Sequence, residues 1–334
     1  MSKQIIAELY KNFDKVTSII THVKNDEKQI EISNLRGSSL SMVISSVFSS
    51  TEKPLLLICN DKEEAAYYLN DLEQLLDADE GSKRDDVLFY PGSYRRPYQI
   101  EDTDNANILL RAEVLNRINS QKKPALIVTY ADALFEQVIT KSELKRNTIK
   151  LSVGETLSLD FIHDLLHEYK FNRVDFVIDP GDFAIRGGII DVFSFSNDHP
   201  FRIEFFGDEI DSIRTFDIES QLSIDRMNKI DIMPNVENKF LEEKRQSFLS
   251  YISSKTVVFT KNPQLNSNRL DKLFEKAKDA FKNLEGEIKH SNPEELFCTG
   301  KLIEDQLLDF TNVLIENSPS HKVSKSINFD TLPQ

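Results

Sequence analysis

The chain has 334 residues and a formal net charge of −14, from 41 Lys and Arg against 55 Asp and Glu. This length predicts two or three domains rather than one core. A hydrophobic share of 40% and a charged share of 29% exclude the disordered and fibrous classes. Because affinity for a phosphate backbone comes from clustered Lys and Arg, we expect little or no DNA binding by this chain.

The sequence shows no membrane, secretion or metal signal. No run approaches the roughly 18 apolar residues of a membrane span, and the start MSKQIIAELYKNFDKV is not a signal peptide. Cys59 and Cys298 lie far apart without CxxC or Cys/His spacing, so we expect a cytoplasmic protein with reduced thiols and no zinc site. His163 and His167 are four residues apart on a predicted helix, and without a third ligand we interpret them as surface residues.

The first third of the chain alternates helical and extended patterns. Residues 2–25 have helical spacing, and the extended run QIEIS is followed by a turn and the helical stretch LSMVISSVFSS. PLLLICND (54–61) predicts a buried strand, and Asp61 is placed to cap the helix KEEAAYYLNDLEQLL. DVLFYPG and PALIVTYADAL predict further buried strands. This β-α-β order predicts an α/β fold with a parallel sheet covered by helices.

After residue 147 strands follow one another closely: RVDFVID, FAIRGGIIDVFSF, PFRIEFF and EIDSIRTFD. Gly207-Asp208 is a two-residue hairpin signature, so we predict an α+β domain with an antiparallel sheet. Beyond 235 we expect the strand TVVFTK, the helix LDKLFEKAKDAFKNLE and a second helix near 301–316. The predicted domains are 1–147, the first part of the α/β domain; 148–235, inserted; 236–320, its completing part; and 321–334, the start of a linker.

The turn between the first strand and its helix is where a phosphate-binding loop would lie in such a sheet. The motif GxxxxGK[ST] needs glycines, a lysine for the outer phosphates and a hydroxyl for magnesium. Gly37 lies inside this turn, but the two glycine positions hold Asn34 and Ser39, the lysine position holds Leu40, and only Ser41 remains. No DExH or DExD box occurs. We therefore expect no nucleotide cofactor and no hydrolysis by this chain.

No other catalytic pattern stands out. There is no GxSxG elbow, and the carboxylate pairs Asp85/Asp86 and Asp208/Glu209 lie in turn-like segments whose usual role is solvation. The acidic run EDTDN (101–105) lacks the glycine and distal glutamate of a calcium loop, so we interpret it as a cap and turn before NILLRAEVLNRI. We predict no catalytic residue and no metal ligand.

Two stretches carry a family resemblance. RVDFVIDPGDFAIRGGIIDVFSFSNDHPFRIEFFGDEIDSIRTFD resembles the domain that UvrB shares with the transcription-repair coupling factor (Mfd) family, through which both meet UvrA. FYPGSYRRPYQIEDTDNANILLRAEVLNRI with ALIVTYADAL resembles the coupling factors' preceding domain. The resemblance covers 87–220 strongly and thins after 235. It implies a degenerate helicase-type α/β domain with an inserted UvrA-docking α+β domain.

Two departures favour the coupling factors over UvrB. UvrB has an intact phosphate loop and a long aromatic β-hairpin that inserts into DNA, and here Tyr94–Tyr98 passes almost directly into a helix. The alternative, a UvrB-class ATP-dependent DNA-damage binder, is opposed by Leu40. The resemblance implies that a full-length family protein is an ATP-dependent DNA translocase, which binds RNA polymerase and DNA through domains outside this sequence.

The resemblance implies that UvrA contacts Arg186, Arg202 and Phe206. Alternation agrees in part, since Phe201, Ile203 and Phe205 share one face of a strand while Arg202, Glu204 and Phe206 share the other. An aromatic beside arginines on a polar face is typical of interface hot spots. Alternatively, Phe206 packs under a loop and Arg202 pairs with Glu204 or Asp211. Nucleic acid is disfavoured, because four basic and ten acidic residues lie between Arg173 and Asp217.

Overall fold

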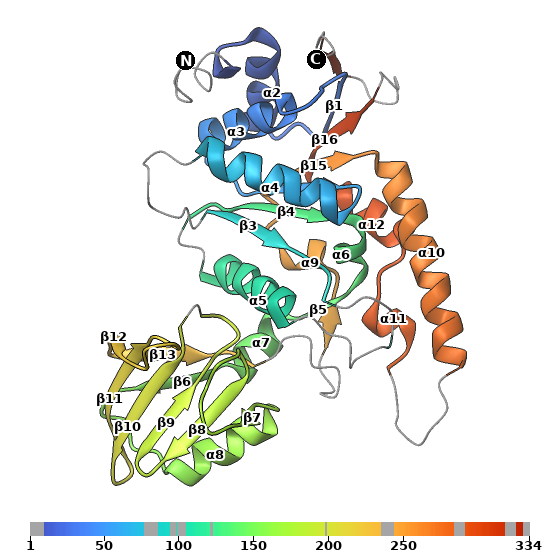
Figure 1. Cartoon of the computed structure of the whole chain (residues 1–334). Helices are drawn as coiled ribbons and strands as arrows, with labels where there is room; N and C mark the ends of the chain where they lie inside the picture. Colours follow the sequence, from blue (N-terminus) through green and yellow to red (C-terminus); the bar gives the residue numbers. More distant parts are fainter. Residues whose placement is uncertain are drawn as a thin grey trace. The chain divides into compact units, whose positions relative to one another are not determined.

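The computed structural model divides the chain into two compact units (Figure 1). The parallel-sheet unit comprises Met1–Asp102, Arg117–Val138 and Arg245–Gln334, and the antiparallel-sheet unit comprises Thr103–Asn116 and Ile139–Lys244. Helix α5 (Asn105–Ser120) begins in the antiparallel-sheet unit and ends in the parallel-sheet unit. The chain changes unit again at β5 (Val138–Ile139) and at β14 (Arg245–Gln246). The structure describes residues 10–76, 86–93, 98, 105–120, 123–197, 199–234, 244–283, 291–317 and 325–329.

The first unit is built on a seven-stranded sheet in the order β17-β1-β16-β15-β2-β4-β3, in which every pair of neighbours is parallel. The central strands β2 and β4 are buried at every residue, as expected for a sheet covered on both faces. The strands are β1 (Gln29–Ser33), β2 (Leu55–Cys59), β3 (Val87–Tyr90), β4 (Leu126–Tyr130), β15 (Val257–Lys261), β16 (Thr311–Glu316) and β17 (Ser326–Asn328).

Two groups of helices cover this sheet. α2 packs on α3 and α3 on α4, whereas α10 packs on α6, α11 and α12. The chain moves across the sheet in one direction up to the edge strand β3 and in the opposite direction after it, and right-handed crossovers then place the helices on opposite faces. The helices are α2 (Asp14–Lys24), α3 (Ser39–Thr51), α4 (Lys62–Leu76), α6 (Ala131–Phe135), α9 (Phe248–Tyr251), α10 (Pro263–Lys282), α11 (Pro293–Leu296) and α12 (Gly300–Leu307).

Three sequence predictions in this unit are corrected. The helix predicted near 301–316 ends at Leu307, and Thr311–Glu316 forms β16 inside the sheet. The predicted strand PALIVTYADAL ends at Tyr130, where α6 begins. The range predicted as a linker contains β17, which pairs with β1. In the first two places a short buried apolar run has no period that separates strand from helix, and β17 is a short polar segment whose strand character comes from pairing with β1.

The second unit carries a six-stranded sheet in the order β12-β11-β10-β9-β8-β7, antiparallel except for the pair β7 and β8. A separate antiparallel pair joins β6 to β13. The elements are α7 (Lys141–Asn147), β6 (Ile149–Ser152), α8 (Leu159–Glu168), β7 (Asn172–Arg173), β8 (Asp182–Arg186), β9 (Ile189–Val192), β10 (Phe201–Phe206), β11 (Glu209–Phe216), β12 (Ser223–Met227) and β13 (Lys229–Ile232).

The two faces of this sheet differ. One face packs against α8, whose His163 and His167 rings contact the ring of Phe183. The other face carries a small buried cluster, formed by Val177, Ala184, Phe193 and Phe216. Arginines and carboxylates lie beside that cluster, so this second face holds the candidate site.

The two-residue hairpin at Gly207-Asp208 is confirmed, since Phe206 pairs with Glu209 and Gly207 has a φ of +64°. FAIRGGIIDVFSF, predicted as one strand, is a second hairpin in which Gly187-Gly188 separates β8 from β9. A Cβ at Gly188 would lie 3.1 Å from the Phe205 carbonyl oxygen, so glycine permits the close approach of β10. Of the predicted strand RVDFVID, only Arg173 lies in a strand, as the second residue of β7.

The predicted fold class is confirmed: an α/β unit with a parallel sheet and a separate unit with a mainly antiparallel sheet. The prediction that 94–104 leaves no room for a DNA-inserting hairpin concerns residues of which only Tyr98 is described. In the described ranges, no helix is long and apolar enough to cross a membrane.

Candidate protein-docking site

The predicted strand-turn-helix is present where a phosphate loop would lie, but its side chains are engaged within the protein. Leu40 is the second residue of α3 and is buried in the core, so its side chain is not directed toward a phosphate. Ser41 is buried and its hydroxyl donates to an Asp71 carboxylate oxygen at 2.9 Å. The Ser39 hydroxyl lies 2.9 Å from the Arg36 backbone nitrogen. The first residues of α3 are therefore packed and hydrogen-bonded within the protein.

Polar groups at the carboxyl ends of the central strands also bind one another. Lys261 at the end of β15 pairs with Glu64 and lies 3.3 Å from the Tyr68 hydroxyl. Burial alone would lower the pKa of Lys261, but the hydrogen bonds and charges of Glu64 and Tyr68 together outweigh burial and raise the pKa. The Asn262 amide donates to the Asn60 side-chain oxygen at 3.1 Å. At the ends of β2 and β15, on the edge where α/β folds usually bind ligands, these polar side chains therefore contact one another.

The two cysteines are buried, and the described residues form no metal-binding group. Cys59 and Cys298 are unbonded and buried, and burial raises the pKa of the Cys298 thiol to about 12. Thiols of this kind stay protonated and behave as small apolar groups. Among the described residues, no group of three His, Cys, Asp or Glu side chains could hold a metal ion.

Strand β10 presents Phe206 to solvent. Phe201 and Ile203 are buried and Phe205 is partly buried, while Arg202 and Glu204 are partly exposed on the other face. Phe206 ends the strand with 84% of its surface exposed. Phe206 therefore does not pack under a loop. Four residues along the strand place it about 13 Å from Arg202 on the same face.

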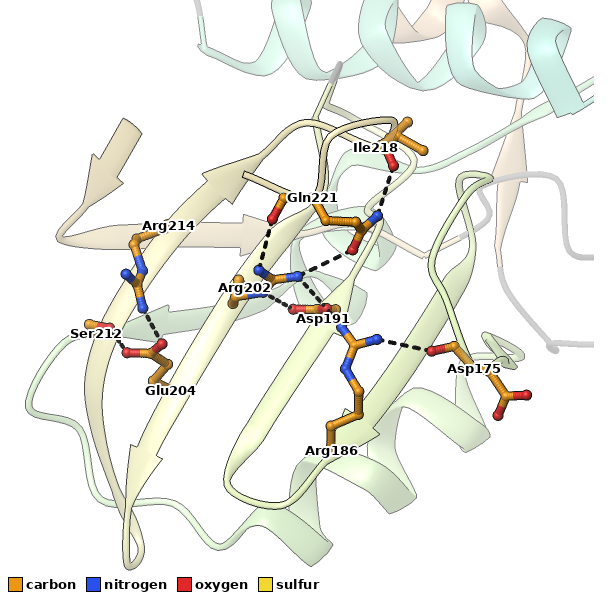
Figure 2. A network of polar contacts seen from close by, with 9 residues as sticks. All are labelled: Asp175, Arg186, Asp191, Arg202, Glu204, Ser212, Arg214, Ile218 and Gln221. Atoms are coloured by element: carbon orange, nitrogen blue, oxygen red, sulfur yellow. Dashed lines mark hydrogen bonds and ion pairs between the residues drawn. The ribbon is translucent and has the colours of Figure 1, made fainter. Parts of the chain in front are cut away.

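Arg186 and Arg202 converge on Asp191, as Figure 2 shows. Arg202 makes two parallel bonds to this carboxylate, from Nε to Oδ1 at 2.7 Å and from Nη2 to Oδ2 at 2.9 Å. Arg186 reaches the same carboxylate through Nη2 and donates from Nη1 to the Asp175 carbonyl at 3.1 Å. Hydrogen bonding to Asp191 raises the pKa of Arg202, so this guanidinium stays charged.

The partner of Arg202 differs from both alternatives considered from sequence. Asp191 lies directly opposite Arg202 in the pairing of β9 and β10, whereas Glu204 pairs with Arg214 and accepts from the Ser212 hydroxyl at 2.8 Å. A residue opposite on the next strand lies about 5 Å away, nearer than a residue two positions along the same strand. The sequence does not identify Asp191 as this partner, because it does not reveal the hairpin between β8 and β9.

Arg202 also contacts the connection between β11 and β12, a segment that the sequence did not single out. It donates from Nη1 to the Gln221 carbonyl at 3.2 Å, and Gln221 has a φ of +58°. The Gln221 amide in turn donates to the Ile218 carbonyl at 2.8 Å (Figure 2). On its other side, the Arg202 guanidinium lies 4.4 Å from the ring centre of Phe216. Arg202 thus joins β9, β10 and the turn before β12.

Comparison with known proteins defines the class of this unit. The family model of the UvrB interaction domain matches residues 149–237, which include Arg186, Arg202 and Phe206. The antiparallel-sheet unit is therefore similar to the UvrB interaction domain.

Relatives that match this chain include transcription-repair-coupling factors, so the resemblance predicted from sequence is confirmed. The chain is 30% identical to that of Bacillus subtilis over 75% of this chain and 21% of the relative. It is 28% identical to that of Myxococcus xanthus, over 65% and 18%, and 26% identical to that of Escherichia coli, over 64% and 18%. The chain spans about a fifth of the length of the relatives it matches.

Proposed function

We propose that this chain is a docking module that recruits UvrA to stalled transcription, as part of a transcription-repair coupling factor. The main observation in support of this proposal is the exposure of Phe206. This aromatic residue has 84% of its surface exposed and lies inside the range matched by the UvrB interaction domain. Arg186 and Arg202 lie on the same face of the sheet. We call these three residues the docking patch.

The composition of the docking patch supports a protein partner. Exposed aromatic and arginine side chains are enriched where interfaces concentrate their binding energy. Phe206 has few contacts to lose on binding and a large apolar surface to bury, which is worth about 2 kcal/mol for a hot-spot aromatic.

The charges of the patch support an acidic group on that partner. Two guanidinium groups share one carboxylate, so Arg186, Arg202 and Asp191 together carry one excess positive charge. Arg186 keeps 39% of its side chain exposed, against 17% for Arg202. Arg186 is therefore the arginine better placed to bind a UvrA carboxylate, since a planar fork matches that group.

The test is the dissociation constant of purified UvrA for this chain and its variants, measured by isothermal titration. Phe206→Ala should weaken binding by about 30-fold, which corresponds to about 2 kcal/mol. Phe161→Ala is the matched control, because Phe161 is 53% exposed on α8, which covers the opposite face. The proposal is wrong if the parent chain does not bind UvrA, or if both alanine variants bind it equally well.

In the full-length protein, further domains would bind RNA polymerase and DNA and supply ATP-dependent translocation. We propose that this chain itself hydrolyses no nucleotide, a proposal supported by Leu40 in the core. The alternative is a UvrB-class ATP-dependent DNA-damage binder. It predicts duplex binding at physiological salt, which the net charge of −14 opposes.

A further inference from the structure

Asp191 is the most buried member of the network beside the docking patch. Its side chain is 1% exposed, and it lies on β9 between the buried residues Ile190 and Val192. A buried carboxylate is costly unless it is paired and hydrogen-bonded. Asp191 meets this requirement with the guanidinium groups of Arg186 and Arg202, which come from the two neighbouring strands.

These contacts fix side chains that are otherwise flexible. An arginine loses much rotamer entropy when a partner immobilises it, and that loss weakens binding unless it has occurred beforehand. The bidentate contact sets the plane of the Arg202 guanidinium, and the remaining carboxylate contact sets the position of Arg186. Figure 2 shows both arginines pointing toward this carboxylate from opposite sides.

The effect of Asp191 extends to the turn before β12. Arg202 donates to Gln221, and Gln221 holds the turn through its bond to Ile218. Leu222, the next residue, is exposed. One carboxylate thus orders, directly or through Arg202, two arginines and a turn that carries an apolar side chain.

We infer that Asp191 is a positioning residue, which holds Arg186 and Arg202 in the geometry that binds a carboxylate of the partner. This inference rests on the proposed docking function. It makes a prediction opposite to that of a role in which Asp191 only neutralises part of the arginine charge. Removing the negative charge should strengthen attraction to an acidic partner if Asp191 only offsets the arginines, and should weaken binding if Asp191 positions them.

The experiment replaces Asp191 by asparagine in the whole chain and measures UvrA binding by isothermal titration. Asp191→Asn should weaken binding about tenfold, the effect of ordering two arginine side chains at the time of binding. Asp191→Glu keeps the charge but displaces it, so this variant should also weaken binding and serves if the asparagine variant does not fold. Glu204→Gln is the matched control, since Glu204 pairs with Arg214 on the same face and should leave affinity unchanged.

A double-mutant cycle separates positioning from a general structural role. If Asp191 acts through Arg186, Asp191→Asn should cost much less affinity in an Arg186→Ala background than in the parent. Additive losses, or parent-like or tighter binding by folded Asp191→Asn, would overturn the inference.

A second readout does not depend on UvrA. The Nε–H resonance of Arg202 and the Nη–H resonances of Arg186 should be sharp and protected from solvent exchange in the parent chain and lose that protection in Asp191→Asn. Unchanged resonances would also overturn the inference. A parent chain that shows these resonances but does not bind UvrA would refute the docking function and leave the ordering of the arginines established.

Discussion

The two units differ in how far the side chains at their candidate sites are exposed to solvent. In the parallel-sheet unit, the strand ends are filled by contacts such as Lys261–Glu64, and the lysine position of the phosphate loop holds the buried Leu40. In the antiparallel-sheet unit, one sheet face keeps arginines near solvent and leaves Phe206 exposed. We therefore propose that the parallel-sheet unit serves as a packed core, while recognition depends on the side chains that packing leaves exposed in the antiparallel-sheet unit.

The largest expected effect sharpens the contrast within the second unit. Phe216 and Phe206 lie on the two strands of one hairpin, but Phe216 is fully buried in the cluster with Phe193. Phe216→Ala should lower the free energy of unfolding by about 3–5 kcal/mol. Phe206→Ala should change it by no more than about 0.5 kcal/mol, as expected for an exposed position. Urea unfolding followed by circular dichroism measures both, and similar losses would mean that Phe206 is a core residue.

The next effect tests whether the phosphate-loop position is core. Leu40→Lys places an ammonium group in the buried start of α3 and should cost about 3 kcal/mol, as for an uncompensated buried charge. Leu40→Met is the control, since a swap of similar volume costs less than about 1.5 kcal/mol. A lysine variant as stable as the parent would show that this side chain reaches solvent, as a phosphate-binding lysine must.

Some features of the site follow from sequence because they depend on neighbours along the chain. The alternation of β10 predicts that Phe206 leaves the core face, and Gly207-Asp208 predicts the hairpin that follows it. The Asp61 cap of α4 is another such local feature, and its side chain accepts from the Glu64 backbone N–H at 2.8 Å. Each of these predictions is confirmed.

Features that depend on strand register do not follow from sequence. Asp191 meets Arg202 only because β9 pairs with β10 in one register, and no residue of β9 signals that register. The sequence predicts a helix at β16 for a related reason: its short apolar run has no clear period, and it forms a strand because it pairs with β1 and β15. The residue contacts of the docking patch stay a prediction until UvrA binding is measured.

A smaller effect distinguishes two ion pairs on the sheet face that carries Arg186 and Arg202: the pair of Arg202 with Asp191 and the pair of Arg214 with Glu204. Arg202→Ala leaves the buried Asp191 with Arg186 alone and should destabilise the chain by about 2 kcal/mol, in the range for a buried group that loses a partner. Arg214→Ala removes the partner of the more exposed Glu204 and should cost at most about 1 kcal/mol. Melting temperatures measure the difference. Equal losses would mean that Asp191 is not more dependent on its partner than Glu204.

The smallest expected effect is none at all: Mg-ATP titrated into the chain should give no heat above dilution. Leu40 is in the core, Ser41 donates to Asp71, and Ser39 contacts Arg36, so no lysine or free hydroxyl faces a phosphate there. Leu40→Lys alone should not create binding, because the glycine positions still hold Asn34 and Ser39. An ATP-hydrolysing protein with an intact phosphate loop is the positive control. A dissociation constant in the low micromolar range would show that the parallel-sheet unit retains a nucleotide site, and the contrast between the units would fail.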